Sequence, residues 1–569
     1  MKRFICSLLS VLIIVCAVPF TAQASSNVIN ITEKQMNDNA YKYIENALKE
    51  AKNNATKEKP YVINVPSGNY TLKKALHIYS NTTLNLEDDT VLLKGFTDGN
   101  MIKLGVKEEA NSGYEGYENV TVNGGVWNGN FKGACIMRFA HCKKITVKNC
   151  ILQNQKNAHF LELAAANNFK ITNCIFEGYL KTESTDALAL QIDIIHNSAH
   201  FSAYEEYDDT PCKNITVSKC TFTDVYSGVG TRSGVVGSYF DNIKIKNNTF
   251  KDLSDIAISA FNFRNSEISG NKINSATMGI TFQTFPDVNA ANRLYLPNDK
   301  DADTDIIKDT NSVIKNNSIT VYNTTYRGNS SGISVYGGSV SAEYAKEIKV
   351  KKGKYYAEGL VLSKNKIKVH SASSGGVIME YANKCSLKDN SIISYSDSSA
   401  DGIIFLNGDN NIVSGNTVKG FFNGISAVSG SVKNKFTKNV IKSNSNYAIS
   451  VDKKSKALIY YGNTVKGNKK GKYHIKSKNY PLYAKDIKLN AEKSLSGNRL
   501  KWNKVKGVSE YKIYRSNKKN GTYKFIKTVK AKKSSYTDYN KKGSKYYYRI
   551  RAVKNVNGSK IYGKYSNKE

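Results

Sequence analysis

After residue 24 the sequence lacks any apolar run that approaches the ~20 residues needed to cross a bilayer, so no transmembrane segment is predicted. Closely spaced cysteine pairs are also absent. Cys6 and Cys16 lie in the first 24 residues, and the later cysteines form no CxxC pair. Their odd number and wide spacing argue against a disulfide framework or a zinc ribbon, and we interpret them as small buried apolar side chains.

Acidic residues are scarce near the C-terminus. From Ser431 to Glu569 the chain has 38 Lys and Arg against 6 Asp and Glu, a net charge of 38 − 6 = +32, so the preceding residues carry 36 − 32 = +4. Such a basic tail is suited to binding anionic cell-wall polymers or acidic glycans, and it serves solubility equally well. It has no recognition motif for nucleic acid, which is therefore not expected as a partner.

The N-terminus indicates export. Lys2 and Arg3 precede an apolar run that ends at the small-residue cleavage site Ala22-Gln23-Ala24. Residues 1–24 are therefore predicted to be a signal peptide. We expect a secreted, extracellular protein that associates with the cell wall if the basic tail binds its polymers.

One phrase recurs along the chain from Val120 onward. Alternating apolar residues, typical of a strand, lead into Cys or Asn, as in ITVKNCILQ (145–153), IKIKNNTFKD (243–252) and LKDNSIIS (387–394). The recurrence at roughly two dozen residues is typical of a solenoid. A second strand, often opened by glycine, lies between the phrases, as in GVIMEY (376–381).

Residues 37–53 have helical spacing, with Ala40, Ile44, Ala47, Leu48 and Ala51 on one side, and would cover the first exposed strand edge. The helix, the VPSGNYTL start (65–72) and the repeat resemble the right-handed parallel β-helices of the pectate-lyase-like superfamily. That superfamily includes polysaccharide lyases, polygalacturonases and other glycosidases. The resemblance covers roughly residues 28–480 and implies a fold more than a reaction.

After Tyr480-Pro481 the pattern changes to short alternating strands joined by turns. This part resembles a fibronectin type III module, with Trp502 and Tyr547-Tyr548 as core markers. The predicted fold class is therefore all-β: a right-handed parallel β-helix with an N-terminal capping helix in residues 25–480, and a small β-sandwich in residues 481–569.

Stacked coils allow the register to be predicted. If the apolar residues of one strand per coil point inward, Arg138, Glu162, Gln191, Gly230 and Ser259 form one outward column. Ala140, Ala164, Asp193, Arg232 and Phe261 form the next. Long insertions follow this strand at 194–212, 285–312 and 337–359, and we expect them to wall a groove for an extended polymer.

These columns favour glycoside hydrolysis by paired carboxylates. Two carboxyl groups ~5–10 Å apart can flank a glycosidic bond, and crowding raises the pKa of one of them. The predicted catalytic residues are Asp193, Glu162, Asp209, Asp208 and Arg232. The predicted substrate-binding residues are Arg138, Gln191, His196, Tyr204, Tyr207 and Phe261, the aromatic ones by stacking on sugar rings.

Two alternatives remain open. A polysaccharide lyase would use Ca²⁺ and a base such as Arg232 or Lys181, and a non-enzymatic surface adhesin would only bind glycans. No cofactor is firmly predicted. Calcium is the one candidate, through the alternating carboxylates Asp299, Asp301, Asp303 and Asp305, which lack the glycine and distal glutamate of a standard calcium loop.

Overall fold

The computed structural model describes residues 27–109, 111–182, 187–199, 201, 206–275, 277–285, 292–302, 304–322, 330–460, 463–476, 481–483, 487–494, 496–505, 508–539, 545–556 and 559–569. The predicted signal peptide, residues 1–24, therefore lies outside the described residues. Within the described part, no helix has both the length and the apolar character that a membrane crossing requires.

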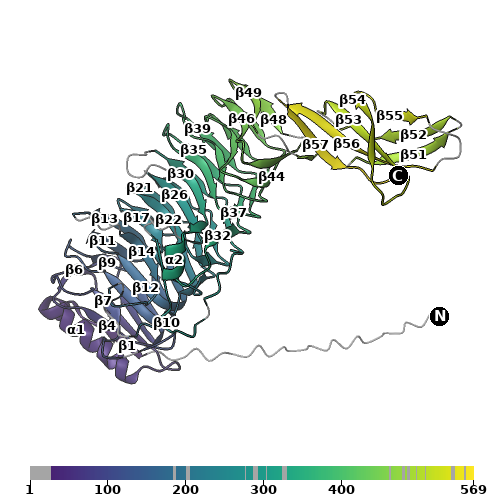
Figure 1. The fold of residues 1–569 in the computed structure, drawn as a ribbon. Coiled ribbons are helices and arrows are strands. Elements are labelled where there is room, and N and C mark those ends of the chain that lie inside the picture. Colours follow the sequence, from purple (N-terminus) through teal and green to yellow (C-terminus); the bar gives the residue numbers. More distant parts are fainter. Residues whose placement is uncertain are drawn as a thin grey trace, which may run out of the picture.

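A long helix caps the first coil (Figure 1). Helix α1 (Glu33–Asn54) begins at Thr32, whose side chain accepts a hydrogen bond from the amide of Gln35 while the Gln35 side chain accepts one from the Thr32 amide. The five residues predicted for its apolar side are all buried, together with Met36. The helix contacts β2, β3 and β4, so it covers the start of the solenoid as predicted.

The chain then winds into a right-handed parallel β-helix with three faces, drawn in Figure 1 as a long stack of strands. Face 1 contains β4 (Leu76–Ile78), β7 (Ile102–Leu104), the start of β10 (Met137–Lys148) and of β12 (Leu161–Thr172), β14 (Leu188–Asp193), β17 (Ser227–Gly230), β22 (Ile256–Phe261), β26 (Met278–Gln283), β30 (Ser331–Tyr336), β36 (Gly375–Glu380), β40 (Ile403–Leu406), β43 (Ile425–Val428), β46 (Tyr447–Val451) and β49 (Gly471–Ile475).

Face 2 adjoins face 1 because β10 and β12 continue across the corner. It contains β1 (Asn27–Asn30), β2 (Tyr61–Val65), β5 (Thr82–Leu86), β8 (Tyr117–Asn123), the ends of β10 and β12, β15 (Lys213–Ser218), β20 (Lys244–Lys246), β24 (Glu267–Ser269), β28 (Val313–Lys315), β34 (Val361–Ser363), β38 (Ser386–Lys388), β41 (Ile412–Ser414), β44 (Val432–Thr437), β47 (Lys456–Tyr460) and β50 (Pro481–Tyr483). Short pairs flank its corner: β19 (Phe240–Asp241) with β23 (Phe263–Arg264), and β33 (Ala357–Glu358) with β37 (Ala382–Asn383).

Face 3 is a separate parallel sheet. It contains β3 (Gly68–Leu72), β6 (Thr90–Lys94), β9 (Val126–Asn128), β11 (Ile151–Lys156), β13 (Ile175–Leu180), β16 (Thr221–Thr223), β21 (Thr249–Leu253), β25 (Lys272–Ser275), β29 (Ser318–Val321), β35 (Lys366–Val369), β39 (Ser391–Ser394), β42 (Thr417–Lys419), β45 (Val440–Lys442) and β48 (Thr464–Lys466). The recurrent phrase forms faces 2 and 3, and the glycine-led strand forms face 1.

The corner between faces 2 and 3 holds a buried ladder. Cys150, Cys174 and Cys220 stack there and pass into Asn248 and Asn271, as predicted. Each later asparagine donates from its side chain to a backbone carbonyl and accepts from the neighbouring coil; for example, Asn416 Nδ2 lies 3.0 Å from Leu387 O. The cysteines of the described residues are buried free thiols. The ladder therefore satisfies polar groups that the turn leaves inside the solenoid.

The insertions after face 1 pack against one another. The segments around 285–312 and 337–359 carry β27 (Arg293–Tyr295), which pairs with β18 (Ser233–Val235), the hairpin β31 (Gly338–Val340) with β32 (Gly353–Tyr355), and α2 (Ala342–Glu347). A small apolar cluster joins them, in which Phe285 stacks on Tyr355 at 4.5 Å. These two insertions therefore pack into one layer beside face 1, and the groove expected between the insertions stays a prediction.

The C-terminal strands are antiparallel. Strands β51 (Leu489–Ser494), β52 (Gly497–Trp502) and β55 (Ser535–Asp538) form one sheet, and β53 (Glu510–Ser516), β54 (Lys524–Lys530), β56 (Tyr547–Val556) and β57 (Ser559–Tyr565) pair in another group. Trp502 and Tyr548 are buried, as expected of core markers. The domain boundary at 480/481 and the fibronectin type III assignment stay predictions.

Candidate functional site

The register of the first predicted column is confirmed, but Glu162, Gln191 and Ser259 are buried and not exposed. Arg138 pairs with Glu162, Glu162 with Gln191, Gln191 with Gly230 and Gly230 with Ser259 across the coils of face 1. In the second column, Ala140, Ala164 and Asp193 are likewise in register. Glu162 and Asp193 therefore lie diagonally on adjacent parallel strands, where a strand spacing of ~4.8 Å and a rise of ~3.3 Å per residue put their Cα atoms ~8 Å apart.

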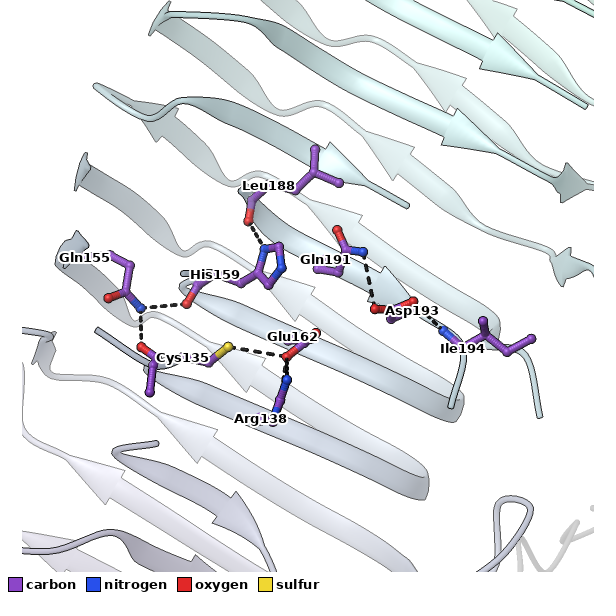
Figure 2. Close-up of polar contacts among 10 residues, drawn as sticks. Cys135, Arg138, Gln155, His159, Glu162, Leu188, Gln191, Asp193 and Ile194 are labelled. Atoms are coloured by element: carbon purple, nitrogen blue, oxygen red, sulfur yellow. Dashed lines mark hydrogen bonds and ion pairs between the residues drawn. The ribbon is translucent and has the colours of Figure 1, made fainter. Parts of the chain in front are cut away.

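Glu162 lies at the centre of a buried polar cluster (Figure 2). Its Oε2 accepts from the Arg138 guanidinium at 2.5 Å and from the Cys135 thiol at 3.3 Å. In the described part of the chain these contacts all use Oε2, and none reaches Oε1. The ion pair therefore orients the carboxylate and leaves one oxygen for a ligand or water.

Asp193 is the other carboxyl of the pair, and only 3% of it is exposed. Its Oδ1 accepts from the Ile194 amide at 2.8 Å, and Gln191 Nε2 lies 3.4 Å from Oδ2 (Figure 2). Burial, and next the charge of Glu162, raise the pKa of Asp193 to about 7. A carboxylic acid with this pKa can donate a proton near neutrality.

Gln191 lies beside Glu162 on the next coil, two residues before Asp193 on the same strand. It is 4% exposed, and its Oε1 has no hydrogen-bond partner within the described part of the chain. A buried amide oxygen without a donor costs free energy, because it has lost its hydrogen bonds to water. A ligand hydroxyl or an ordered water at this position would remove that cost.

The placement of Arg232 differs from the prediction. Strand β17 ends at Gly230, so its pairing with β14 stops at Gln191 and does not extend to Asp193 and Arg232. The Arg232 Nη2 lies 3.4 Å from Ser227 Oγ and 3.7 Å from Asp255 Oδ2, toward the start of the strand. The prediction was wrong about the column because it assumed that the strand continues at full length.

The 194–212 insertion covers the end of these strands. Phe201 and Ile195 pack on Ala140, Ala164 and Ala165, with Tyr207 at the margin. The ring of Phe201 also lies under the Arg138 guanidinium, at 4.3 Å. This insertion therefore holds Arg138 against Glu162 and restricts water at the two carboxyl groups.

The acidic pair in that insertion connects loops. Asp209 accepts from His196 Nδ1 at 2.7 Å and from the Asn298 amide at 2.5 Å, while Asn298 Nδ2 donates to the carbonyls of His196 and Tyr207. Asp208 accepts from the Gly113 amide at 2.6 Å. These contacts give the two aspartates roles in loop positioning, and the catalytic roles predicted for them find no support in this geometry.

The aromatic residues predicted to stack on sugar rings differ in their burial. Phe261 is fully buried in the cluster of the insertions, so its ring has no face available to a sugar, and this prediction is corrected. Tyr204 lies outside the described residues. Tyr295 stacks on His196 at 4.7 Å and is close enough to Asp193 for the two to interact electrostatically. His196 and Tyr295 therefore belong to the wall beside Asp193.

The sequence reasoning missed His159 and Cys135. His159 lies two residues before Leu161, and its Nδ1 is 2.6 Å from the carbonyl of Leu188 (Figure 2). Burial lowers the pKa of His159, and Arg138 and Arg232 lower it further, although Glu162 opposes them. Cys135 and His159 precede the strands that begin at Met137 and Leu161, and strict alternation would place both side chains on the inner side, opposite Glu162. Their approach to Glu162 comes from the turn before each strand, which the register does not predict.

The described residues contain no group of three or more His, Cys, Asp or Glu that could hold a metal ion. In the predicted calcium loop, Asp299 Oδ1 accepts from the Asp301 amide of the same loop at 2.9 Å, and Asp305 contributes its carbonyl to Tyr239. Asp303 lies outside the described residues. The calcium site stays a prediction, and no chemistry is assigned to it.

Comparison with known proteins supports the fold. A family model described as "Right handed beta helix region" matches residues 306–487. A search of curated protein sequences gives no match.

Similar solved structures include an adhesin and two glycan-active enzymes. PfbA, a surface adhesin of Streptococcus pneumoniae, is 16% identical over 86% of this chain and 95% of its own, with a TM-score of 0.47. The A-module of the Azotobacter vinelandii mannuronan C-5 epimerase AlgE6 is 11% identical over 78% of this chain and 94% of its own, at 0.41. The Yersinia enterocolitica family 28 exopolygalacturonase is 13% identical over 67% of this chain and 76% of its own, at 0.39.

Proposed function

We propose that this protein cleaves a polysaccharide or complex glycan by glycoside hydrolysis on face 1, with Asp193 and Glu162 as the carboxyl pair. The observation that carries the proposal is that two carboxyl groups lie on adjacent coils of one face in opposite electrostatic environments. The pKa of Asp193 is raised to about 7, whereas Glu162 is paired with Arg138. This is the arrangement that separates a proton donor from its partner carboxylate.

In the proposed reaction, protonated Asp193 donates its proton to the glycosidic oxygen as the bond breaks. Glu162 acts through Oε1, either on a water molecule or on the sugar carbon, while Oε2 stays with Arg138 and Cys135. Gln191 Oε1 accepts from a sugar hydroxyl, which supplies its missing partner. His196 and Tyr295 line the wall beside Asp193.

Access to the carboxyl groups is part of the proposal. Glu162 and Asp193 are almost completely buried, and the Phe201 side chain packs on Ala140 and Ala164 at their end of the face. A glycan therefore requires the Phe201 side chain to move before it reaches both groups. Water exclusion after closure would strengthen the electrostatic interactions of the site.

The first test uses the secreted form of the chain on a polysaccharide panel. Reducing ends should appear without the ultraviolet absorbance of unsaturated uronates. Asp193→Asn and Glu162→Gln should each lower turnover by roughly 10²–10⁴-fold while glycan binding persists. Asp252→Asn is the matched control, because its carboxylate is exposed on face 3. Unchanged turnover in both site variants would refute the assignment, and absorbance that rises with the reducing ends would establish the lyase alternative.

One observation favours a second candidate, a surface adhesin without catalysis. The Arg138–Glu162 pair is buried and stacked under Phe201, and buried ion pairs also occur as purely structural features. In that case the panel would reveal a bound glycan with no turnover, and Asp193→Asn and Glu162→Gln would change stability alone.

We further propose that residues 1–24 direct export and that, within the predicted residues 481–569, the antiparallel strands from Leu489 onward form a fibronectin type III-like module next to the catalytic β-helix. The support is the basic and apolar pattern at the N-terminus and the antiparallel strands at the C-terminus. Mass spectrometry of the secreted protein should find Ser25 as the mature N-terminus.

A further inference from the structure

The last coil of the solenoid meets the C-terminal strands far from β12 and β14, which carry the carboxyl pair (Figure 1). A concave surface lies at this junction. Here β49 of face 1 contacts β56. The cavity has a volume of about 520 Å³, within the range of ligand pockets. The side chains that line it are Tyr447, Lys470, Lys472, Tyr473, Lys554 and Asn555.

Backbone pairing holds the two walls of this cavity together. Strand β57 pairs in parallel with β50, so a C-terminal strand continues face 2 of the solenoid. Strand β56 pairs with β57 and carries Lys554 and Asn555. Strands β46 and β49 pair in register and carry the opposite wall. The pocket therefore depends on main-chain hydrogen bonds across the junction and is formed before any ligand binds.

The charged side chains that line the cavity are all positive. Three lysines from two segments face one cavity, Lys470 and Lys472 around the start of β49 and Lys554 on β56, and none of the lining residues carries a carboxylate. Burial, and next the charge of Lys472, lower the pKa of Lys554, so its ammonium group is already destabilised by its surroundings. An anion in the pocket would reduce both effects, because it supplies the opposite charge within a few ångströms.

Aromatic rings complete the surface. The Lys554 ammonium lies 5.4 Å from the centre of the Tyr473 ring, and Tyr447 stacks on His474 at 4.7 Å. Tyrosine rings offer flat apolar surfaces with a polar edge, which suits a sugar ring. Lysine ammonium groups pair with carboxylate or phosphate oxygens through charge-assisted hydrogen bonds.

We propose that this junction pocket, defined by Lys470, Lys472, Lys554, Tyr447 and Tyr473, binds an anionic segment of a polysaccharide. The bound groups are carboxylates or phosphates on the glycan, and the tyrosines contact the sugar rings. The pocket gives the basic C-terminal region a defined binding site, in addition to the diffuse attraction that its net charge produces. It is separate from the carboxyl pair, so binding here does not depend on cleavage.

The test is calorimetric titration of the full secreted chain with oligogalacturonate, with its fully methyl-esterified form and with a poly(glycerol phosphate) oligomer. Either anionic glycan should bind and the esterified one should bind at least tenfold more weakly. Each of Lys470→Gln, Lys472→Gln and Lys554→Gln should weaken binding by about tenfold, because each removes one charge-assisted contact. Comparison of the two anionic probes identifies whether carboxylate or phosphate is preferred.

The matched control removes the same charge elsewhere. Lys527, Lys532 and Lys533 are exposed on the C-terminal strands and turns. Replacing all three by Gln gives a control triple variant. It has the same net charge as the pocket triple variant, in which Lys470, Lys472 and Lys554 are all replaced by Gln. The control should bind within about threefold of the unmodified chain. Equal losses in the two triple variants would overturn the proposal, as would tighter binding of single-stranded DNA than of both anionic glycans.

Two readouts keep this result distinct from the proposed cleavage. Circular dichroism and thermal unfolding of the pocket variants should match the unmodified chain, which excludes loss of the fold as the cause of weak binding. Hydrogen exchange with the anionic glycan bound should slow at the backbone amides of β49 and β56 and stay unchanged in β12 and β14. Slowing confined to β12 and β14 would place the anion site on face 1 and overturn the assignment to the junction.

Discussion

Replacing Asp193 by asparagine should make the free energy of unfolding less dependent on pH, because the buried carboxyl group that titrates is removed. The pKa of about 7 lies about 3 above the ordinary value of 3.8. Each unit of difference corresponds to 1.36 kcal/mol, so ionising Asp193 costs about 4 kcal/mol more in the folded chain than in the unfolded chain. The variant removes this cost because asparagine stays neutral at every pH tested.

The direction of the pH dependence follows from how tightly the folded and unfolded chains bind the Asp193 proton. The folded chain holds the Asp193 proton more tightly than the unfolded chain, so the stability contributed by the neutral acid is fully present below about pH 4. It is lost as the pH rises from about 4 to about 7. Between pH 5 and pH 8 the loss is therefore about 3 kcal/mol.

The assay is urea unfolding of the unmodified chain and Asp193→Asn at pH 5 and pH 8. The unmodified chain should lose about 3 kcal/mol more than the variant across this interval, and Asp252→Asn should behave like the unmodified chain. Catalytic efficiency of the unmodified chain should also fall as the pH rises through about 7, because the proposed proton donor becomes ionised. Equal pH dependence of unfolding in the unmodified chain and Asp193→Asn would refute the reasoning about this carboxyl group.

Two other substitutions test the surroundings of the pair. Arg138→Gln leaves the buried Glu162 charge without its cation and should lower the free energy of unfolding by about 3–5 kcal/mol. The double variant Arg138→Gln/Glu162→Gln should recover much of this loss. A double-mutant cycle that shows no recovery would contradict the ion pair. Gly230→Ala should cost more than about 1 kcal/mol in the same assay, because a Cβ at φ +155° would lie 2.0 Å from the Ser259 carbonyl oxygen; a neutral effect would contradict the close approach of these coils.

Much of the fold could be predicted because a solenoid repeats its information in every coil. The alternation in ITVKNCILQ and its later versions places Ile145 and Val147 inside face 2 and Leu152 inside face 3. One register then extends to every neighbouring coil, and Arg138, Glu162, Gln191, Gly230 and Ser259 follow from it. Periodicity is a strong signal where each unit repeats the interactions of the previous one.

The candidate site was predicted less completely because its insertions do not repeat. Nothing in the pattern of Asp208 and Asp209 indicates that one binds the Gly113 amide and the other binds His196 and Asn298. Phe261 continues an outward column, yet the insertions that begin at Phe285 and Gly337 cover it. Long-range packing of this kind depends on tertiary contacts between loops, which local periodicity does not encode.

The same architecture explains how the chain tolerates an unfavourable site. In a stack of coils, each coil contacts chiefly its neighbours, so the cost of burying Asp193 and Glu162 stays local to β12 and β14. Later coils of face 1 have Ser334, Ile378, Ile404 and Ser426 at the equivalent outward position, where no charge is buried. The buried asparagine ladder adds hydrogen bonds along most of the remaining length. Stability supplied by the repeats thus allows two coils to hold carboxyl groups whose burial costs free energy.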